Sequence, residues 1–129
     1  MTLRTSSRAA ANPATEPAVV TKAVNRAAER LELSNRILAG VLGLSEATVS
    51  RMGNGAYQIE AGSKPFELAV LFLRLFRSLD GIAGGDPTVA RAWLRNENTA
   101  LGAKPVTLIE SVAGLVNVVA YLDARRALG

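Results

Sequence analysis

The segment from residue 34 to residue 52 constrains the fold of this chain more than any other. Ser34 and Ser45 can each cap a short helix, because a serine hydroxyl accepts a hydrogen bond from a backbone N–H of the first helical turn. Gly43 lies between these helices and tolerates a positive φ, while the small Ala39 lets the helices approach closely. This spacing predicts two helices that cross through a tight turn, as in a helix-turn-helix motif.

Apolar residues occupy the positions of this segment that face inward when the two helices cross. They are Leu38, Leu42, Leu44, Val49 and Met52. An ordinary helical hairpin with a glycine turn would satisfy the same pattern, and helix-turn-helix units also occur in proteins that bind only other proteins. The pattern favours a DNA-binding motif and leaves both alternatives open.

Helix signals dominate the chain from Glu16 onward, and strand signals are nearly absent, so we expect an all-α architecture. Serine caps, an Asp-Pro pair, glycine stops and a Thr107/Glu110 capping box place the helix ends. The expected helices cover residues 18–31, 35–42, 46–52, 64–80, 87–95 and 108–128.

Composition divides the chain into three parts. Residues 1–17 contain two prolines and little apolar surface, so we expect a disordered lead, with an arginine-bearing arm along DNA as the alternative. The glycine-rich stretch 53–63 then separates a helix-turn-helix domain, residues 18–63, from a helical domain, residues 64–129. The run 68–73 is apolar all round its helix, which predicts either the centre of the fold or a homodimer interface.

The residue types that are missing exclude much chemistry. The chain has no Cys and no His, which excludes the commonest zinc sites, disulfides, thiol chemistry and Ser-His-Asp triads. No pair of acidic residues has a spacing that indicates acid–base catalysis, so we expect a binding protein, not an enzyme, with no cofactor and no metal. The most apolar run, 66–79, is shorter than the roughly 20 residues that span a bilayer, so we expect a soluble protein with no membrane partner. The absence of Cys agrees with a cytoplasmic location.

The charge of the chain permits DNA binding without requiring it. Fifteen Lys and Arg residues against eleven Asp and Glu residues give a net charge of +4. Contact with operator DNA must therefore come from the placement of single residues on the motif. One recognition helix reads too little DNA for high specificity, so we expect a homodimer. The candidate DNA-binding residues are Arg36, Ser45, Glu46, Thr48, Ser50 and Arg51.

These candidates differ in what they can contact. Arg51 is the principal candidate for a base or phosphate, and Thr48 and Ser50 can reach either. Ser45 and the helix N-terminus point at phosphate and base edges, and Arg36 is placed for a backbone phosphate. Glu46 either accepts a hydrogen bond from a cytosine amine or only favours the helix N-terminus.

The carboxyl-terminal half carries a second pattern: a Trp-Leu pair, an Asn, a Leu-Gly pair, a Pro, a Leu-rich helix start and a Gly. The residues are Trp93, Leu94, Asn96, Asn98, Leu101, Gly102, Pro105, Leu108, Ile109 and Gly114, followed by 118–122 and Gly129. In this order, and after a helix-turn-helix, they resemble the toxin-binding domain of the Xre/MbcA/ParS antitoxin family. The resemblance covers about residues 18–129.

This resemblance implies a type II antitoxin with a helical toxin-binding domain behind the helix-turn-helix. Its partner would be a RES-domain toxin, an enzyme similar to ADP-ribosyltransferases that consumes NAD. The domain would obstruct the toxin's NAD pocket, and the helix-turn-helix would repress the shared operon.

Particular residues carry the implied toxin contact. Trp93 would shape the toxin-binding surface, and the closer contacts would come from Arg125, Arg126 and Gly129 at the end of the chain. Guanidinium groups suit a phosphate-binding or acidic pocket, although the two arginines equally complement the dipole of the last helix. A stand-alone repressor whose carboxyl-terminal half only dimerises, and an adaptor that binds only proteins, remain as alternatives.

Overall fold

A computed structural model describes residues 16–128 of the chain. Within this range there is no strand beyond a single bridge between Asn98 and Ala103, which confirms the all-α expectation. The helices of the described range are α2 (Pro17–Arg30), α3 (Asn35–Leu42), α4 (Glu46–Gly53), α5 (Lys64–Ile82), α6 (Pro87–Arg95), α7 (Pro105–Leu108) and α8 (Val112–Leu128). Most of the expected disordered lead, 1–17, lies outside the described residues, and its last residue, Pro17, already begins α2.

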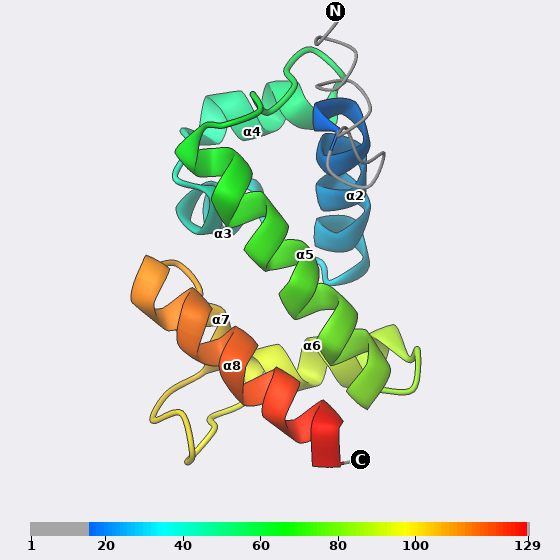
Figure 1. The fold of residues 1–129 in the computed structure, drawn as a ribbon, viewed down its shortest axis with the longest axis vertical. Helices are drawn as coiled ribbons and strands as arrows, with labels where there is room; N and C mark the ends of the chain where they lie inside the picture. Colours follow the sequence, from blue (N-terminus) through cyan, green and yellow to red (C-terminus); the bar gives the residue numbers. More distant parts are fainter. Residues whose placement is uncertain (1–15, 129) are drawn as a thin grey trace, which may run out of the picture.

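Helix α5 runs through the middle of the molecule. It contacts α2 and α3 on the amino-terminal side and α6 and α8 on the carboxyl-terminal side (Figure 1). The Ser63 hydroxyl caps its start, where Pro65 lacks an N–H that would have had no partner. Leu68, Ala69 and Phe72 of the apolar run 68–73 are buried at the centre of the fold, the first of its two predicted roles, whereas Val70 is 40% exposed.

The amino-terminal helices form the predicted helix-turn-helix. The Ser34 hydroxyl accepts a hydrogen bond from the backbone N–H of Ile37 at 3.1 Å, and the Ser45 hydroxyl accepts one from that of Thr48 at 3.1 Å. Gly43 closes α3 with φ of +70°, in the left-handed region that a side chain disfavours. The caps and the glycine turn therefore act as the sequence predicts.

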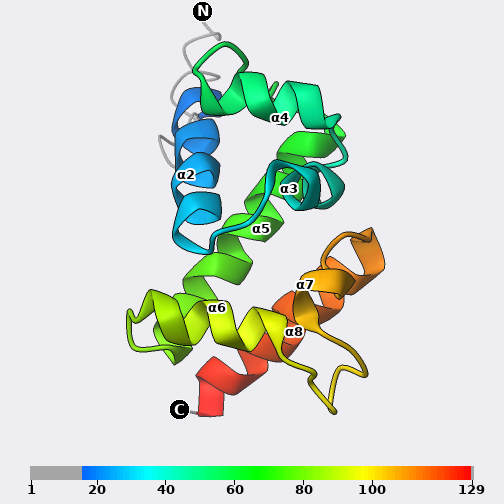
Figure 2. The same ribbon diagram turned by 180° about the vertical axis from the view of Figure 1, so that it is seen from behind.

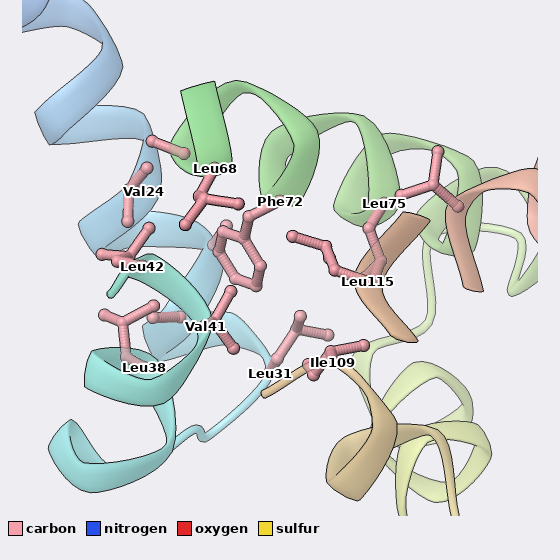
Figure 3. Close-up of a cluster of buried hydrophobic side chains, with 14 of the residues drawn as sticks. Val24, Leu31, Leu38, Val41, Leu42, Leu68, Phe72, Leu75, Ile109 and Leu115 are labelled. Atoms are coloured by element: carbon pink, nitrogen blue, oxygen red, sulfur yellow. The ribbon is translucent and has the colours of Figure 1, made fainter. Parts of the chain in front are cut away.

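One apolar core joins the two halves of the chain. Figure 3 shows side chains of α3, such as Val41, packed around Phe72 of α5, with Leu115 of α8 close by. Leu31 and Ile109 close the same cluster, and neither is exposed to solvent. The helix-turn-helix and the carboxyl-terminal helices thus share buried apolar surface.

The prediction of one final helix over residues 108–128, opened by a capping box, is wrong. Thr107 lies within the short α7, and α8 begins only at Val112, where the Ser111 hydroxyl accepts a hydrogen bond from the Gly114 N–H at 3.0 Å. Between these helices Ile109 is fully buried. A Cβ on Gly114 would overlap the carbonyl oxygen of Leu108, so the turn depends on glycine at that position. Burial of Ile109 and this close backbone approach break the helix that periodicity alone predicts.

Arginines of α6 tie the carboxyl-terminal half to the end of α2. Arg91 donates to the carbonyl oxygen of Arg30 at 3.0 Å, and Arg95 donates to that of Glu32 at 2.8 Å. Arg30 in turn donates to the carbonyl of Gly85 at 2.8 Å. Since the last carbonyls of a helix have no partner within it, these contacts satisfy the end of α2 and hold α6 next to that end, as seen in Figure 2.

Candidate functional site

The first candidate surface is the outer face of α4, which lies at the end of the molecule farthest from α8 (Figure 1). Val49 and Met52 point inward and are buried, and the Asn25 amide donates to the carbonyl oxygen of Met52 at 3.0 Å. These contacts hold α4 against α2. They leave Glu46, Ser50 and Arg51 exposed on the other side of the helix.

Three predicted DNA-binding residues are linked by hydrogen bonds along this face. The Ser45 hydroxyl donates to the Thr48 hydroxyl at 2.9 Å, and the Arg51 guanidinium donates to the same Thr48 oxygen at 3.0 Å. The spacing of three residues places them on successive turns of one helix face. Arg51 is therefore aligned along the helix, with remaining guanidinium donors available for an anion or a base edge.

The other three predicted DNA-binding residues are less closely joined to this network. Glu46 and Ser50 are exposed on α4, and neither has a side-chain hydrogen bond or an ion pair within residues 16–128. Arg36, on α3, lies instead 3.8 Å from the carboxylate of Glu110, between α7 and α8. The structure thus brings together Ser45, Thr48 and Arg51 and turns Arg36 toward the carboxyl-terminal half.

The second candidate surface is a stack of side chains from α6 and α8. The rings of Trp93 and Tyr121 lie 6.2 Å apart at an interplanar angle of 22°. The guanidinium of Arg125 lies 5.8 Å from the centre of the Tyr121 ring and donates to its hydroxyl at 3.2 Å. A cation over an aromatic face is attracted by the ring quadrupole, so the stack fixes the direction of Arg125.

Arg126 belongs to a polar cluster between α5 and α8. Its guanidinium donates to the Ser78 hydroxyl at 3.2 Å, and this hydroxyl donates to the Asp123 carboxylate at 2.8 Å. Arg74 forms an ion pair with Asp123 at 2.6 Å. The Ser78 hydroxyl, with Arg74 beside it, lowers the pKa of Asp123 below its ordinary value.

The two arginines border a cleft at the end of the chain. It encloses about 660 Å³ and is lined by Gly81, Ile82, Arg125, Arg126 and Leu128. Arg125 borders this cleft and also contacts Tyr121, which stacks on Trp93, so the structure brings three of the predicted toxin-binding residues near one another. Gly129, the fourth predicted toxin-binding residue, lies outside the described residues.

Sequence reasoning missed three residues that build this surface: Tyr121, Ser78 and Asp123. Tyr121 carried a signal, because it precedes Arg125 by four residues and so lies on the same helix face. Ser78 and Asp123 carried none. They are 45 residues apart, and only the packing of α5 on α8 brings them into contact.

Residues 16–128 contain no group of acidic residues arranged to hold a metal ion. None of their helices is long and apolar enough to cross a membrane.

The fold and these two surfaces define a helix-turn-helix protein with an appended helical domain. Residues 10–74 match the family described as the antitoxin Xre-like helix-turn-helix domain. Residues 78–127 match the antitoxin Xre/MbcA/ParS C-terminal toxin-binding domain. A search of curated proteins found no match.

The chain belongs to the Xre/MbcA/ParS antitoxin family, and it is an antitoxin with a helix-turn-helix and a toxin-binding domain. The two matches meet within α5, the helix that packs against both halves. The surface of α4 falls within the first domain, and the Trp93–Tyr121–Arg125 stack falls within the second. Families of both kinds are in general not enzymes.

Proposed function

We propose that this antitoxin neutralises a RES-domain toxin that consumes NAD, by obstructing the toxin's active site, and that it represses its own operon through α4. The observation that carries the first part is the stack, because Trp93, Tyr121 and Arg125 form a shaped, cationic surface inside the toxin-binding domain. We expect the antitoxin to act in the cytoplasm, because its two proposed partners, the NAD-consuming enzyme and the operator DNA, are there.

Arg125 is the residue best placed to enter an active site built for NAD. It is exposed, while Tyr121 holds its guanidinium in one direction. A guanidinium forms two parallel hydrogen bonds with a carboxylate. It can therefore pair with acidic groups in a pocket that binds NAD. Arg126 is held by Ser78, so its role is to shape the cleft beside Arg125 and to add positive charge there.

Co-expression with a RES-domain toxin tests this proposal. Cells that make the toxin should lose NAD, and the antitoxin should restore NAD and co-purify with the toxin. Arg125→Glu should abolish this rescue, because it places a carboxylate where the cation enters. Lys104→Glu, which makes the same charge change in the loop before α7, should leave rescue intact. If the antitoxin neither binds nor neutralises such a toxin, RES specificity is wrong.

Operon repression rests on the α4 face. A homodimer would present two such faces to two half-sites of an operator, about one helical turn of DNA apart. Binding to the promoter of its own operon should weaken steeply as salt increases, because arginine contacts to phosphate release counterions. An affinity that does not depend on salt would instead indicate an adaptor that binds only proteins.

The stand-alone repressor predicts different results in the same experiments. Its carboxyl-terminal half would only dimerise, so Arg125→Glu would change the oligomeric state or nothing. No toxin would co-purify. If the dimeric protein captures the toxin and Arg125→Glu loses this capture without changing the mass of the dimer, the result supports an antitoxin that inhibits an enzyme.

A further inference from the structure

A groove between α2 and α5 lies apart from both candidate surfaces. It encloses about 520 Å³, and its walls are the outer faces of the two helices, which lie side by side in Figures 1 and 2. Its lining residues are Val19, Lys22, Ala23, Arg26, Leu73, Phe76 and Arg77. The groove thus joins an apolar floor to a rim of cations.

The floor of the groove exposes several apolar side chains to solvent. Val19 is 45% exposed, and Leu73 and Phe76 are only partly covered by the core. Val70, one turn before Leu73 on α5, is 40% exposed and extends the apolar strip along the helix. Contiguous exposed apolar surface rimmed by charged residues is typical of a protein-binding site.

The rim is positive and has no internal counter-charge. Lys22, Arg26 and Arg77 form no ion pair within residues 16–128, whereas Arg30 and Arg74 on the same two helices each pair with an aspartate. No acidic residue lines the groove. The charge of this site is therefore left for a ligand to balance.

Charge also limits what can fill the groove. The chain's own first fifteen residues contain Arg4 and Arg8 and no acidic residue, so they would add positive charge to a positive rim. A second copy docked about a two-fold axis through the groove would oppose its own three cations to an identical set, which is unfavourable. Neither occupant complements the site.

We infer that the α2–α5 groove binds an acidic amphipathic helix of a partner protein. Leucine-like side chains of that helix pack on Val19, Leu73 and Phe76, and carboxylates along its two edges pair with Lys22, Arg26 and Arg77. The site is separate from the Trp93–Tyr121–Arg125 stack. The inference therefore does not depend on the toxin that the stack is proposed to inhibit.

Binding of designed peptides to the full chain tests this inference. The probe is a fluorescein-labelled 14-residue helix with leucines spaced for one face and glutamates on its flanks, and a second peptide replaces every glutamate with lysine. The acidic peptide should bind, as measured by fluorescence anisotropy, and the basic peptide should not. Equal binding of both peptides, or of neither, would overturn the inference.

Two matched pairs of variants locate the binding. Arg26→Glu/Arg77→Glu should lower the affinity for the acidic peptide by about tenfold or more, since the reversed charges at the rim repel its glutamates. Lys64→Glu/Lys104→Glu makes the same charge change outside the groove and should leave the affinity for the acidic peptide unchanged. Val19→Ser should weaken binding about threefold by removing apolar contact, whereas Val112→Ser, at a similarly exposed valine of α8, should not.

The same variants distinguish the other occupants. If Arg26→Glu/Arg77→Glu alters the oligomeric state in sedimentation, the groove holds a second copy. If the variant weakens the binding of duplex DNA as much as the binding of the acidic peptide, the groove is a nucleic-acid surface. Either result overturns the assignment to a partner helix, and unchanged sedimentation and DNA affinity support it.

Discussion

The face of α4 and the stack at the end of α8 are built in different ways. On α4, Ser45, Thr48 and Arg51 come from one turn and one helix, three residues apart, and bond to one another. In the stack, Trp93 and Tyr121 come from two helices, and the neighbouring cluster joins Ser78 of α5 to Asp123 of α8. One surface is local, and the other exists only when the helices pack.

This difference predicts different vulnerabilities. A local surface persists as long as its own helix forms, so single substitutions on it should change binding more than stability. An assembled surface depends on every helix that contributes to it. Substitutions at the contacts between these helices should therefore change stability and the shape of the surface together. Helix α5 contacts both halves of the chain, so a substitution in its core should affect both surfaces.

Phe72→Ala should break the comparison by damaging both surfaces at once. Phe72 is fully buried and points from α5 into the shared cluster (Figure 3). Loss of a buried phenylalanine leaves a cavity and should lower the free energy of unfolding by about 3–5 kcal/mol. In guanidinium denaturation, Trp93 fluorescence reports the stack and far-UV circular dichroism reports all helices. The two transitions should shift together, and two separate transitions would show that the halves unfold independently.

Arg51→Ala should change the local surface alone. It removes the guanidinium from the exposed face of α4 and should weaken specific operator binding by about 1–3 kcal/mol, while the unfolding midpoint stays within error. A gel-shift titration at physiological salt measures this change, with Lys104→Ala as the control. Unchanged affinity would remove Arg51 from the interface.

Asp123→Ala should change the assembled surface alone. The buried Ser78 hydroxyl then loses the acceptor for its proton, which should cost about 1–2 kcal/mol of stability. Toxin capture should fall because Arg126 and the end of α8 lose their fixed position, and operator affinity should stay the same. Denaturation and co-purification measure the two effects, and a loss of operator affinity would show that the two surfaces are coupled.

The pH dependence of stability isolates the charge of Asp123. The pKa of this carboxyl is lowered in the folded protein by the Ser78 hydroxyl and Arg74, so its stabilising contribution is complete above the ordinary value of 3.8. It is lost as the pH falls below that value and the carboxylate binds a proton. Asp123→Asn should therefore flatten the fall in stability below about pH 4. An identical acid profile in the variant and the unaltered protein would exclude this role.

Ser45→Ala sharpens the comparison through a matched control on the neighbouring helix. Loss of the cap on α4 should cost about 1 kcal/mol of stability. Ser34→Ala removes an equivalent cap on α3 and should cost the same. Only Ser45→Ala should also weaken operator binding, because Ser45 supports Thr48 and Arg51. Equal operator binding by the two variants would show that Ser45 acts only as a cap.

Sequence reasoning located the helix-turn-helix because its signals are short-range. A cap, a glycine at positive φ and an inward apolar pattern all act within a few residues. The same reasoning failed at residues 107–114, where Thr107 and Glu110 matched a capping box while burial of Ile109 and the close approach at Gly114 decided the outcome. The predicted positions of Trp93, Arg125 and Arg126 came from a family resemblance, because spacing alone did not relate residue 93 to residue 125.

The sequence by itself determined where most helices begin and end, which faces they bury and which side of α4 carries its polar residues, because these properties depend on neighbours within one or two turns. Tertiary structure alone decided that Tyr121 stacks on Trp93, that Asp123 accepts from Ser78, and that α6 arginines reach the end of α2. Helical periodicity fixes which residues share a face. It does not fix which face of another helix they meet, since that choice belongs to the packing of the whole core.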